Sequence, residues 1–397
     1  MLMPLHIKLL KLLSWLAFAI ASFLMLSAHS FAFETKAKAA YVFDMTTGTV
    51  LVSKNADTPL PPASMSKLMT LYVAFEFIKA GQLKLDERLP VSQHAQDYGG
   101  STMFLTTRDR VLVEDLLRGI IVLSGNDACA VIAEALSPDG TEAGFAQLLT
   151  QRARQMGMTN SVFKNSNGWP AIGHRMSVRD LALITQRLIL DFPEFYTMFS
   201  QKEFLFDGRA PANSLNRNPL LGLGVGADGL KTGHTQEAGY GLVGSVKQGG
   251  RRLIFVFSGL TSTAERAHEA EAIVNWAFRQ FSVKSFGQKD INIALAPVWN
   301  GSSLNVGLAL SKDLDVLVPD LGATIVEFTV EYDSPIPAPV QAGQEIGKLI
   351  ITAGNMDPAT IPLVANTSIP MGGFFSRLMT AGKSLLNKIT NGPKVAL

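Results

Sequence analysis

The sequence contains a single cysteine, Cys129, so no disulfide bond can form within the chain. Cys129 lies in an apolar segment, and that position favours a small buried side chain over a catalytic thiol. The six histidines show no H-E-x-x-H or similar spacing, so we expect neither a metal site nor a cofactor. The chain also shows no internal repeat and no low-complexity tract.

Charged residues make up only 17% of the chain, and acidic residues are absent from residues 1–32 and 371–397. The formal net charge of +2 depends on the basic residues of these two ends, which are Lys8, Lys11, Arg377, Lys383, Lys388 and Lys394. Subtracting these six from the 35 basic residues leaves 29 against 33 acidic ones. We expect no nucleic-acid partner, because such a partner requires a basic patch on the folded body.

The first 32 residues have the pattern of a signal peptide. His6, Lys8 and Lys11 supply positive charge, an apolar run covers residues 12–26, and small residues precede a cleavage site after Ala32. The alternative is an uncleaved membrane anchor. Export implies a location outside the cytoplasm.

The C-terminal residues 371–397 predict a basic amphipathic helix that anchors the protein peripherally. With each residue turned by about 100°, the apolar residues between 374 and 389 fall within an arc of roughly 140°. The opposite side carries Arg377, Lys383 and Lys388. Because the segment is too interrupted to span a bilayer, we expect it to lie in the interface and bind anionic lipid. The alternative is a helix packed on its own domain.

A hydroxyl and an amine lie three residues apart in Ser64-Met65-Ser66-Lys67. The preceding Pro61-Pro62 suits a loop that enters a helix, and the apolar spacing after Lys67 predicts that the helix continues. Residues i and i+3 share a helix face, so Lys67 can lie beside Ser64. A serine becomes a nucleophile when a base takes its proton, and lysine can be that base if burial or positive charge lowers its pKa.

Two further triplets make this pair part of a larger pattern. Ser124-Gly125-Asn126 follows an apolar stretch, and Lys231-Thr232-Gly233 precedes a strand-like hairpin. The order S-x-x-K, S-x-N, K-T-G is similar to that of penicillin-binding proteins and serine β-lactamases. Three motifs in this order, each in a fitting context, are much more specific than any one of them.

Additional segments carry a closer resemblance; they are Tyr41-Val42-Phe43-Asp44, Thr47-Gly48, Met156-Gly157-Met158, Asn165-Ser166-Asn167-Gly168, Asn216-Arg217-Asn218, Asp228-Gly229-Leu230, His234-Thr235, and Arg266 with Glu269. With them, the chain from about residue 39 to about 280 resembles the D-alanyl-D-alanine carboxypeptidases, the low-molecular-mass penicillin-binding proteins, and the tail resembles them more weakly. Two segments depart from the family pattern, Trp169-Pro170 in place of leucine and Ser177-Val178 in place of threonine-alanine.

The resemblance implies a transpeptidase-like fold and a peptidoglycan stem peptide that ends in D-Ala-D-Ala as the substrate. Ser64 would attack the carbonyl of the penultimate D-Ala and form an acyl-enzyme, with Lys67 as the general base. Ser124 would relay a proton to the departing amine, since a hydroxyl both donates and accepts. β-Lactams such as penicillin would act as inhibitors by acylating Ser64.

The predicted substrate-binding residues are Asn126, Lys231, Thr232, Gly233, His234 and Arg217. Asn126 would bond the substrate amide and Lys67 at once. Lys231 and Thr232 would face the terminal carboxylate, and Lys231 would lower the pKa of Lys67 by like-charge repulsion. Arg217 is interpreted as a second cation at that carboxylate or, alternatively, as part of a structural ion pair.

Three further positions complete the expected geometry. Gly233 has no side chain, so the substrate backbone could lie against its strand as an added strand. The N–H groups of Ser64 and His234 would hold the oxyanion. Arg266 and Glu269 are interpreted as an ion pair on one helix face.

Periodicity predicts two domains after the signal peptide. Residues 33–284 indicate an α/β domain in which helices cover an antiparallel sheet, and residues 285–370 indicate a small all-β domain for spacing or docking. The first domain is predicted to contain two strands within residues 39–55, a hairpin of residues 239–246 and 252–260, and helices at residues 66–80, 112–136, 142–157, 177–190 and 265–278. Strands of the second domain are predicted at residues 291–295, 304–309, 323–332 and 345–352.

Four functions are compatible with motifs of this kind. We favour a D,D-carboxypeptidase, and a D,D-endopeptidase would use the same catalytic parts. A serine β-lactamase shares the three motifs, but no counterpart of the class A deacylating glutamate is recognised. A non-catalytic cell-wall-binding protein should show a broken motif, whereas all three are intact here. The sequence leaves the oligomeric state open.

Overall fold

The computed structural model describes residues 33–373 except 210–212, 321–323 and 355. The predicted signal peptide and the predicted amphipathic helix from residue 374 onward lie outside the described residues. The chain divides into residues 1–34 and residues 35–397, and the elements below belong to the second unit. Within the described ranges, no helix has both the length and the hydrophobicity needed to cross a bilayer.

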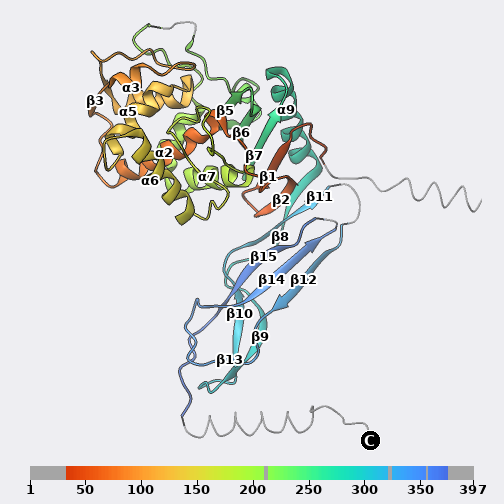
Figure 1. The fold of residues 1–397 in the computed structure, drawn as a ribbon. Coiled ribbons are helices and arrows are strands. Elements are labelled where there is room, and N and C mark those ends of the chain that lie inside the picture. The colour runs from red at the N-terminus through yellow and green to blue at the C-terminus, as the bar shows by residue number, and fades with distance from the viewer. Residues whose placement is uncertain (1–32, 210–212, 321–323, 355, 374–397) are drawn as a thin grey trace, which may run out of the picture. The chain divides into compact units, whose positions relative to one another are not determined.

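A five-stranded antiparallel sheet with strand order β2-β1-β7-β6-β5 forms the framework of the α/β domain (Figure 1). The predicted hairpin is confirmed, because β6 and β7 pair with each other on either side of Gly249-Gly250. β5 is at the edge of the sheet, with β6 as its strand neighbour. The strands are β1 (Ala39–Asp44), β2 (Thr49–Lys54), β5 (Ala227–Thr235), β6 (Gly239–Gln248) and β7 (Arg251–Leu260).

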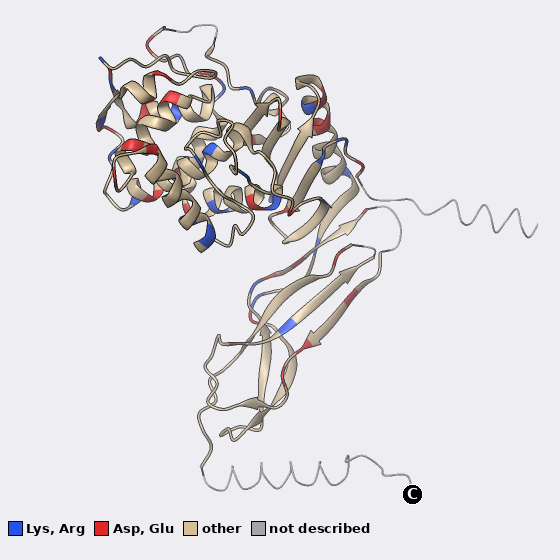
Figure 2. Ribbon diagram, viewed as in Figure 1, with Lys and Arg blue, Asp and Glu red and all other residues tan. Residues whose placement is uncertain are grey.

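The sheet is buried because helices pack against it. Ile254 and Val256 of β7 join the main hydrophobic core beside α2 and α7, whereas the intervening Phe255 points to the opposite face, as the strand period requires. Figure 2 shows acidic and basic positions interspersed over these helices. The helices are α2 (Lys67–Lys79), α3 (Gln93–Gln96), α4 (Val113–Arg118), α5 (Asn126–Leu136), α6 (Glu142–Gln155), α7 (Val178–Asp191), α8 (Pro193–Tyr196) and α9 (Thr263–Gln280), with short turns η1 (Ala63–Ser66), η2 (Gly119–Leu123), η3 (Thr197–Ser200) and η5 (Pro219–Gly222), and a small hairpin of β3 (Arg88–Pro90) and β4 (Arg110–Leu112).

The predicted continuous helix over residues 112–136 is wrong. α4 ends at Arg118, the π-helical turn η2 follows, and the chain turns at Ser124, whose φ is 64° and ψ is 34°. α5 begins at Asn126, whose backbone N–H donates to the Ser101 carbonyl at 2.7 Å. The apolar pattern continues through this break because every residue of η2 is buried, so periodicity alone could not reveal it.

Ser177 caps α7, as its position in the sequence predicts. Its Oγ accepts a hydrogen bond from the Asp180 N–H at 3.1 Å. The Asp180 carboxylate does not complete a capping box; it accepts instead from the Asn160 N–H and the Ser161 hydroxyl. These bonds tie the start of α7 to the segment that follows α6.

The second domain is all-β, as predicted, and has its own hydrophobic core. It contains a six-stranded sheet of order β12-β14-β15-β10-β9-β13 and a pair formed by β8 and β11. The sequence pattern did not predict β15, because Pro362 lies in its middle and a proline within an apolar run argues against a strand. The strands are β8 (Phe281–Gly287), β9 (Asn292–Trp299), β10 (Asn305–Leu310), β11 (Leu314–Pro319), β12 (Val326–Glu331), β13 (Ile336–Pro337), β14 (Glu345–Ala353) and β15 (Ala359–Ala365).

Candidate active site

Ser64 lies in the turn η1, which leads directly into α2. Ala63 opens this turn with a φ of 48°, an uncommon conformation for a residue with a side chain. Gly168 packs against the same peptide: a Cβ at Gly168 would lie 1.9 Å from the Ala63 carbonyl oxygen. This backbone contact leaves no space for a side chain at residue 168, and it holds the turn that presents Ser64.

Lys67, the first residue of α2, is completely buried at 0% exposure. Its Nζ lies 2.8 Å from Ser64 Oγ, 2.8 Å from Asn126 Oδ1 and 2.7 Å from the Asn167 carbonyl oxygen. Burial lowers the pKa of Lys67 to about 8, and the positive charge of Arg217 acts in the same direction. Roughly a tenth of Lys67 is therefore neutral at pH 7, and a neutral amine beside a serine hydroxyl can accept its proton.

The Ser124-Gly125-Asn126 turn faces this lysine. Asn126 accepts from Lys67 through its amide oxygen and donates to the Gly99 carbonyl oxygen at 2.8 Å through its amide nitrogen. Ser124 Oγ is buried and has no hydrogen-bond partner within the described residues. A buried hydroxyl without a partner is costly, so this group is suited to bonding a substrate or a water molecule.

The triplet Lys231-Thr232-Gly233 lies inside β5 at the edge of the sheet, directly before the hairpin of β6 and β7, as predicted. Lys231 is 3% exposed, and its Nζ donates to the Thr232 carbonyl oxygen at 3.2 Å. Burial and the positive charge of Lys67 hold the pKa of Lys231 well below its ordinary value. The repulsion between the two lysines thus lowers the pKa of Lys231, whereas burial and Arg217 lower that of Lys67; the predicted effect of Lys231 on Lys67 stays a prediction.

Gly233 has a packing role in addition to the role predicted for it. A Cβ on Gly233 would lie 3.0 Å from the Pro62 carbonyl oxygen, 3.0 Å from Met65 Cγ and 3.2 Å from Ala63 Cβ. The missing side chain therefore lets β5 approach the turn that carries Ser64. η1 fills the face of the sheet beside Gly233, and the predicted pairing of substrate with the edge of β5 stays a prediction.

Arg217 has no ion-pair partner among the described residues. The alternative role, a structural ion pair, is therefore excluded within this part of the chain. It donates to Ser101 Oγ at 2.7 Å, to Asn213 Oδ1 at 2.9 Å and to the Leu123 carbonyl oxygen at 3.3 Å. These neutral acceptors leave its positive charge uncompensated beside the Ser124 turn. Such a charge attracts an anionic ligand.

The predicted ion pair between Arg266 and Glu269 is wrong. Glu269 accepts from the Thr35 hydroxyl at 2.7 Å, whereas the Arg266 guanidinium lies over the Tyr240 ring at 5.8 Å. The His234 ring stacks on the same Tyr240 ring, with 3.9 Å between the two centroids. The His234 side chain is thus engaged by Tyr240, and its backbone N–H belongs to the strand that borders Ser64.

Two family models cover most of the chain. The model described as D-alanyl-D-alanine carboxypeptidase matches residues 26–261, and the model described as penicillin-binding protein 5, C-terminal domain, matches residues 281–371. The chain belongs to the D-alanyl-D-alanine carboxypeptidase family. It is 35% identical to D-alanyl-D-alanine carboxypeptidase DacC of Escherichia coli, over 86% of each chain, and 32% identical to DacF of Bacillus subtilis, over 86% of this chain and 88% of that protein.

Solved structures of this family have the same fold. Penicillin-binding protein 5 of Haemophilus influenzae superposes with a TM-score of 0.76 at 30% identity, covering 85% of this chain and 98% of that one. Penicillin-binding protein D2 of Listeria monocytogenes, in its ampicillin-bound form, superposes with a TM-score of 0.56 at 30% identity, covering 62% of this chain and 99% of that one.

The sequence analysis did not predict that Ser166 and Asn167 bond to α2 beside Lys67. The Asn167 carbonyl accepts from Lys67, and the Ser166 carbonyl accepts from the Thr70 hydroxyl of α2. Both carbonyls belong to Asn165-Ser166-Asn167-Gly168, a segment that carried the family resemblance without an assigned role. A backbone carbonyl leaves no signature in the sequence, because every residue has one. The only signal was Gly168, a glycine at a position where two backbone segments approach closely.

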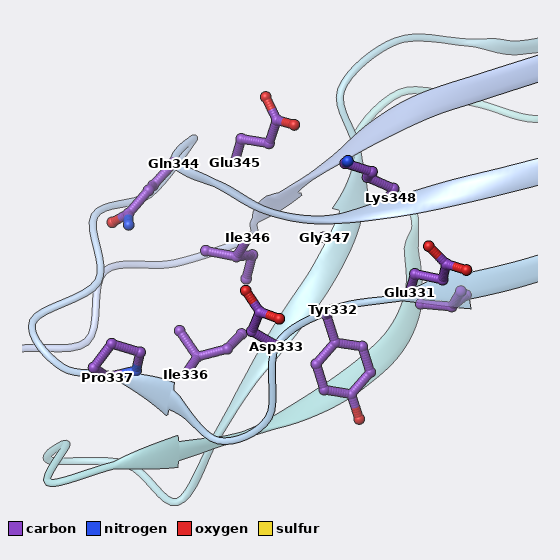
Figure 3. A pocket seen from close by; sticks show the side chains of 11 residues that line it. Glu331, Tyr332, Asp333, Ile336, Pro337, Gln344, Glu345, Ile346, Gly347 and Lys348 are labelled. Atoms are coloured by element: carbon purple, nitrogen blue, oxygen red, sulfur yellow. The ribbon is translucent and has the colours of Figure 1, made fainter.

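The C-terminal domain of this chain contains a hollow of about 910 Å³ along β12 and β14 (Figure 3). Glu331, Asp333 and Glu345 line it together with Lys348, and Tyr332 forms part of its wall (Figure 3). It contains neither a serine nor a histidine that could act as a nucleophile or a base. The serine–lysine chemistry of the Ser64 site therefore has no counterpart in this hollow.

Proposed function

We propose that this protein is a serine D-Ala-D-Ala carboxypeptidase that removes the terminal D-Ala from peptidoglycan stem pentapeptides. The observation that carries this proposal is the 2.8 Å separation of Lys67 Nζ and Ser64 Oγ, with the lysine fully buried and its pKa lowered. The reaction passes through an acyl-enzyme on Ser64. Family membership over most of the chain supports the substrate class.

Acylation begins when neutral Lys67 takes the hydroxyl proton of Ser64. Ser64 Oγ attacks the carbonyl carbon of the penultimate D-Ala, and the negative charge that forms on the carbonyl oxygen is held by the backbone N–H groups of Ser64 and His234. One such donor can contribute about 10²–10³ in rate. The C–N bond then breaks, and the proton carried by Lys67 reaches the departing amine through the Ser124 hydroxyl.

Deacylation repeats these steps with water. A water molecule loses a proton to Lys67 and attacks the ester carbonyl, and the ester bond to Ser64 Oγ breaks as that proton returns to the serine. The products are free D-Ala and a stem peptide shortened by one residue. Lys67 ends in its initial neutral state, so the cycle balances without a cofactor.

The substrate carboxylate is bound by positive charge at the edge of β5. Lys231, Thr232 and Arg217 supply two cations and a hydroxyl, and Arg217 carries no competing carboxylate. A β-lactam presents a carboxylate and a strained amide in a comparable arrangement, so it acylates Ser64 as well. In that case the leaving nitrogen stays covalently attached to the acyl-enzyme, because it is part of the opened ring.

Two other enzymes remain as alternatives. A β-lactamase needs fast deacylation, but the two carboxylates that act electrostatically on Lys67 are occupied: Asp127 accepts from the N–H groups of Met103 and Leu105, and Glu142 is bound by Ser166. A D,D-endopeptidase would cleave cross-linked rather than terminal D-alanyl bonds. The same residues could serve it, so only the products separate it from the carboxypeptidase.

The protein acts outside the cytoplasm. We propose that residues 1–32 direct export and are cleaved after Ala32, and that residues 371–397 attach the protein to anionic lipid at the periplasmic face of the inner membrane. The charge of both segments supports this, since their six basic residues have no acidic neighbours. The substrate, peptidoglycan, lies in the same compartment.

Mass spectrometry of a digested stem pentapeptide tests the function. We expect the loss of one alanine and the release of D-Ala, and no cleavage of cross-linked muropeptides. Ser64→Ala should abolish both this activity and covalent labelling by fluorescent penicillin while the protein remains folded. Labelling of Ser64→Ala would refute the nucleophile, and rapid repeated hydrolysis of penicillin would favour the β-lactamase.

A further inference from the structure

Glu142, the first residue of α6, is a buried carboxylate that bonds to both walls around Lys67. One oxygen, Oε1, accepts from the Ser166 N–H at 2.9 Å and from the Ser166 hydroxyl. The other, Oε2, lies 2.6 Å from the Tyr98 hydroxyl and 2.7 Å from His94 Nε2. No catalytic motif contains Glu142, yet its four bonds join three separate segments of the chain.

The first wall is the loop of residues 165–168. Ser166 is fixed by Glu142 on one side and, through its carbonyl, by the Thr70 hydroxyl on the other. The next residue, Asn167, offers its carbonyl to Lys67 at 2.7 Å. The position of this carbonyl therefore depends on the bonds that Glu142 makes to Ser166.

The second wall follows Tyr98. The adjoining Gly99 carbonyl accepts from the Asn126 amide nitrogen at 2.8 Å, and the Ser101 carbonyl accepts from the Asn126 backbone N–H at 2.7 Å. These bonds orient the amide so that its oxygen faces Lys67. By holding the Tyr98 hydroxyl, Glu142 also fixes the segment that orients Asn126.

The two acceptors decide where the lone pair of Lys67 points. A neutral amine has two N–H donors and one lone pair, and the Asn126 and Asn167 oxygens can only accept. When both donors bond to these oxygens, the lone pair is left for the Ser64 hydroxyl at 2.8 Å. A lysine without both acceptors would rotate freely and direct its lone pair at Ser64 only part of the time.

We propose that Glu142 is a positioning residue that aims the lone pair of Lys67 at Ser64 by holding the Asn126 and Asn167 oxygens in place. This inference rests on the proposed function, because it assigns the proton transfer to Lys67. Glu142 itself touches neither Ser64 nor the substrate. Glu142 assists the proton transfer through the positions of these oxygens. Its negative charge acts separately and disfavours the neutral form of Lys67.

The charge of Glu142 favours the protonated form of Lys67 and so raises its pKa, against the lowering by burial and Arg217. The ionisable groups that act on Lys67 are Cys129, Asp127, Glu142, Arg217, Lys231 and His174. Those that contact Glu142 are His94 and Tyr98. Geometry and charge can therefore be separated by two substitutions at this one residue.

The experiment measures the second-order rate of penicillin acylation between pH 6 and pH 10 with the full chain. Glu142→Ala removes all four bonds, and we expect a loss of about 10²-fold on the plateau above pH 9, the size that a 1 Å misplacement causes. Glu142→Gln can accept from Ser166 and donate to Tyr98 and to neutral His94. We expect it to keep most of the rate above pH 9 and to shift the acid limb to lower pH.

Smaller substitutions keep the test decisive if Glu142→Ala does not fold. Ser166→Ala and Tyr98→Phe each remove one bond to Glu142, and each should slow acylation, with Lys67→Ala as the fully impaired reference. Glu76→Ala is the matched control. Glu76 lies in α2, the helix of Lys67, and forms an ion pair with Arg152 of α6. Glu76→Ala should leave acylation unchanged.

Unchanged acylation in folded Glu142→Ala, or in both Ser166→Ala and Tyr98→Phe, would overturn the positioning role. A fall for Glu142→Gln as large as that for Glu142→Ala would also overturn it, since charge rather than geometry would then control the rate. Failure of the unaltered protein to be acylated would instead count against the proposed function. The two failures are therefore distinguishable in one set of measurements.

Discussion

The indole ring of Trp169 lies against Gly100, where an added Cβ would be 3.1 Å from Cζ3 of the ring and 3.3 Å from Nδ2 of Asn126. The same ring packs edge-on against Tyr98, with 6.1 Å between the ring centroids. Trp169 remains 43% exposed, so much of its surface is available to a ligand beside Asn126. At this position the chain departs from the leucine of its family.

We predict that Trp169→Leu changes selectivity among penicillins. An acyl side chain that stacks on the indole gains about 0.5–1.5 kcal/mol from the aromatic contact, or about 2–10-fold in acylation rate. The measurement is the ratio of acylation rates for benzylpenicillin and 6-aminopenicillanic acid, which lacks the aromatic acyl group. Trp169→Leu should lower this ratio.

Trp169→Phe is the control, since it keeps an aromatic face and should retain most of the ratio. Equal losses for both penicillins in Trp169→Leu would contradict the prediction. They would mean that the indole supports the loop of residues 165–168 rather than contacting the ligand.

The pKa of Lys67 predicts the pH dependence of acylation. The base must be neutral, and its pKa is lowered to about 8, so the rate should rise about tenfold per pH unit below pH 8 and level off above it. Protonation of Lys67 at lower pH removes the lone pair that accepts the Ser64 proton. Rapid-mixing measurements with a chromogenic β-lactam would record this acid limb.

Arg217→Gln tests the electrostatic origin of that limb. The charge of Arg217 lowers the pKa of Lys67, so its removal should move the limb to higher pH. The rate on the plateau should also fall, because the carboxylate is bound more weakly. That fall lowers the whole profile and does not move the acid limb. A limb that stays in place would contradict the electrostatic coupling between the two residues.

The motifs could be predicted from the sequence because each is a fixed spacing of side chains. Ser64 and Lys67 share one helical turn, and the hairpin of β6 and β7 follows from alternation around Gly249-Gly250. The fold class and the family were predicted on these grounds, and both are confirmed. Local pattern was sufficient wherever neighbours in sequence determine the structure.

The contacts around Lys67 could not be predicted because they depend on distant backbone groups. The Asn167 carbonyl comes from residues about a hundred positions away, and the left-handed turn at Ser124 interrupts a continuous apolar pattern. The packing role of Gly233 was missed for the same reason, since only the packed structure shows that η1 fills the space beside it. Tertiary contact, rather than propensity, decides each of these positions.

Deletion of residues 374–397 tests the proposed membrane attachment. The segment is basic and contains no acidic residue, so its binding should require anionic lipid and weaken with added salt. Co-sedimentation with phosphatidylglycerol vesicles should be lost on deletion, while soluble carboxypeptidase activity is retained. Binding that persists in the deletion variant would place the attachment elsewhere.

Gly168→Ala should impair the site without touching any catalytic side chain. Its φ is +82°, which costs a residue with a Cβ about 1–2 kcal/mol, and the new Cβ would lie 1.9 Å from the Ala63 carbonyl oxygen. The loop must move away from η1, and it carries the Asn167 carbonyl with it. We expect a lower melting temperature and a fall in acylation of about 10²-fold, measured with fluorescent penicillin.

Gly157→Ala separates backbone strain from the clash. Gly157 has a similar φ of +87°, but nothing lies within 4 Å of its added Cβ. It should therefore lower the melting temperature through strain alone and leave acylation intact. If Gly168→Ala lost stability and activity no more than Gly157→Ala, the contact between Gly168 and Ala63 would not be what holds Ser64 and Lys67 together.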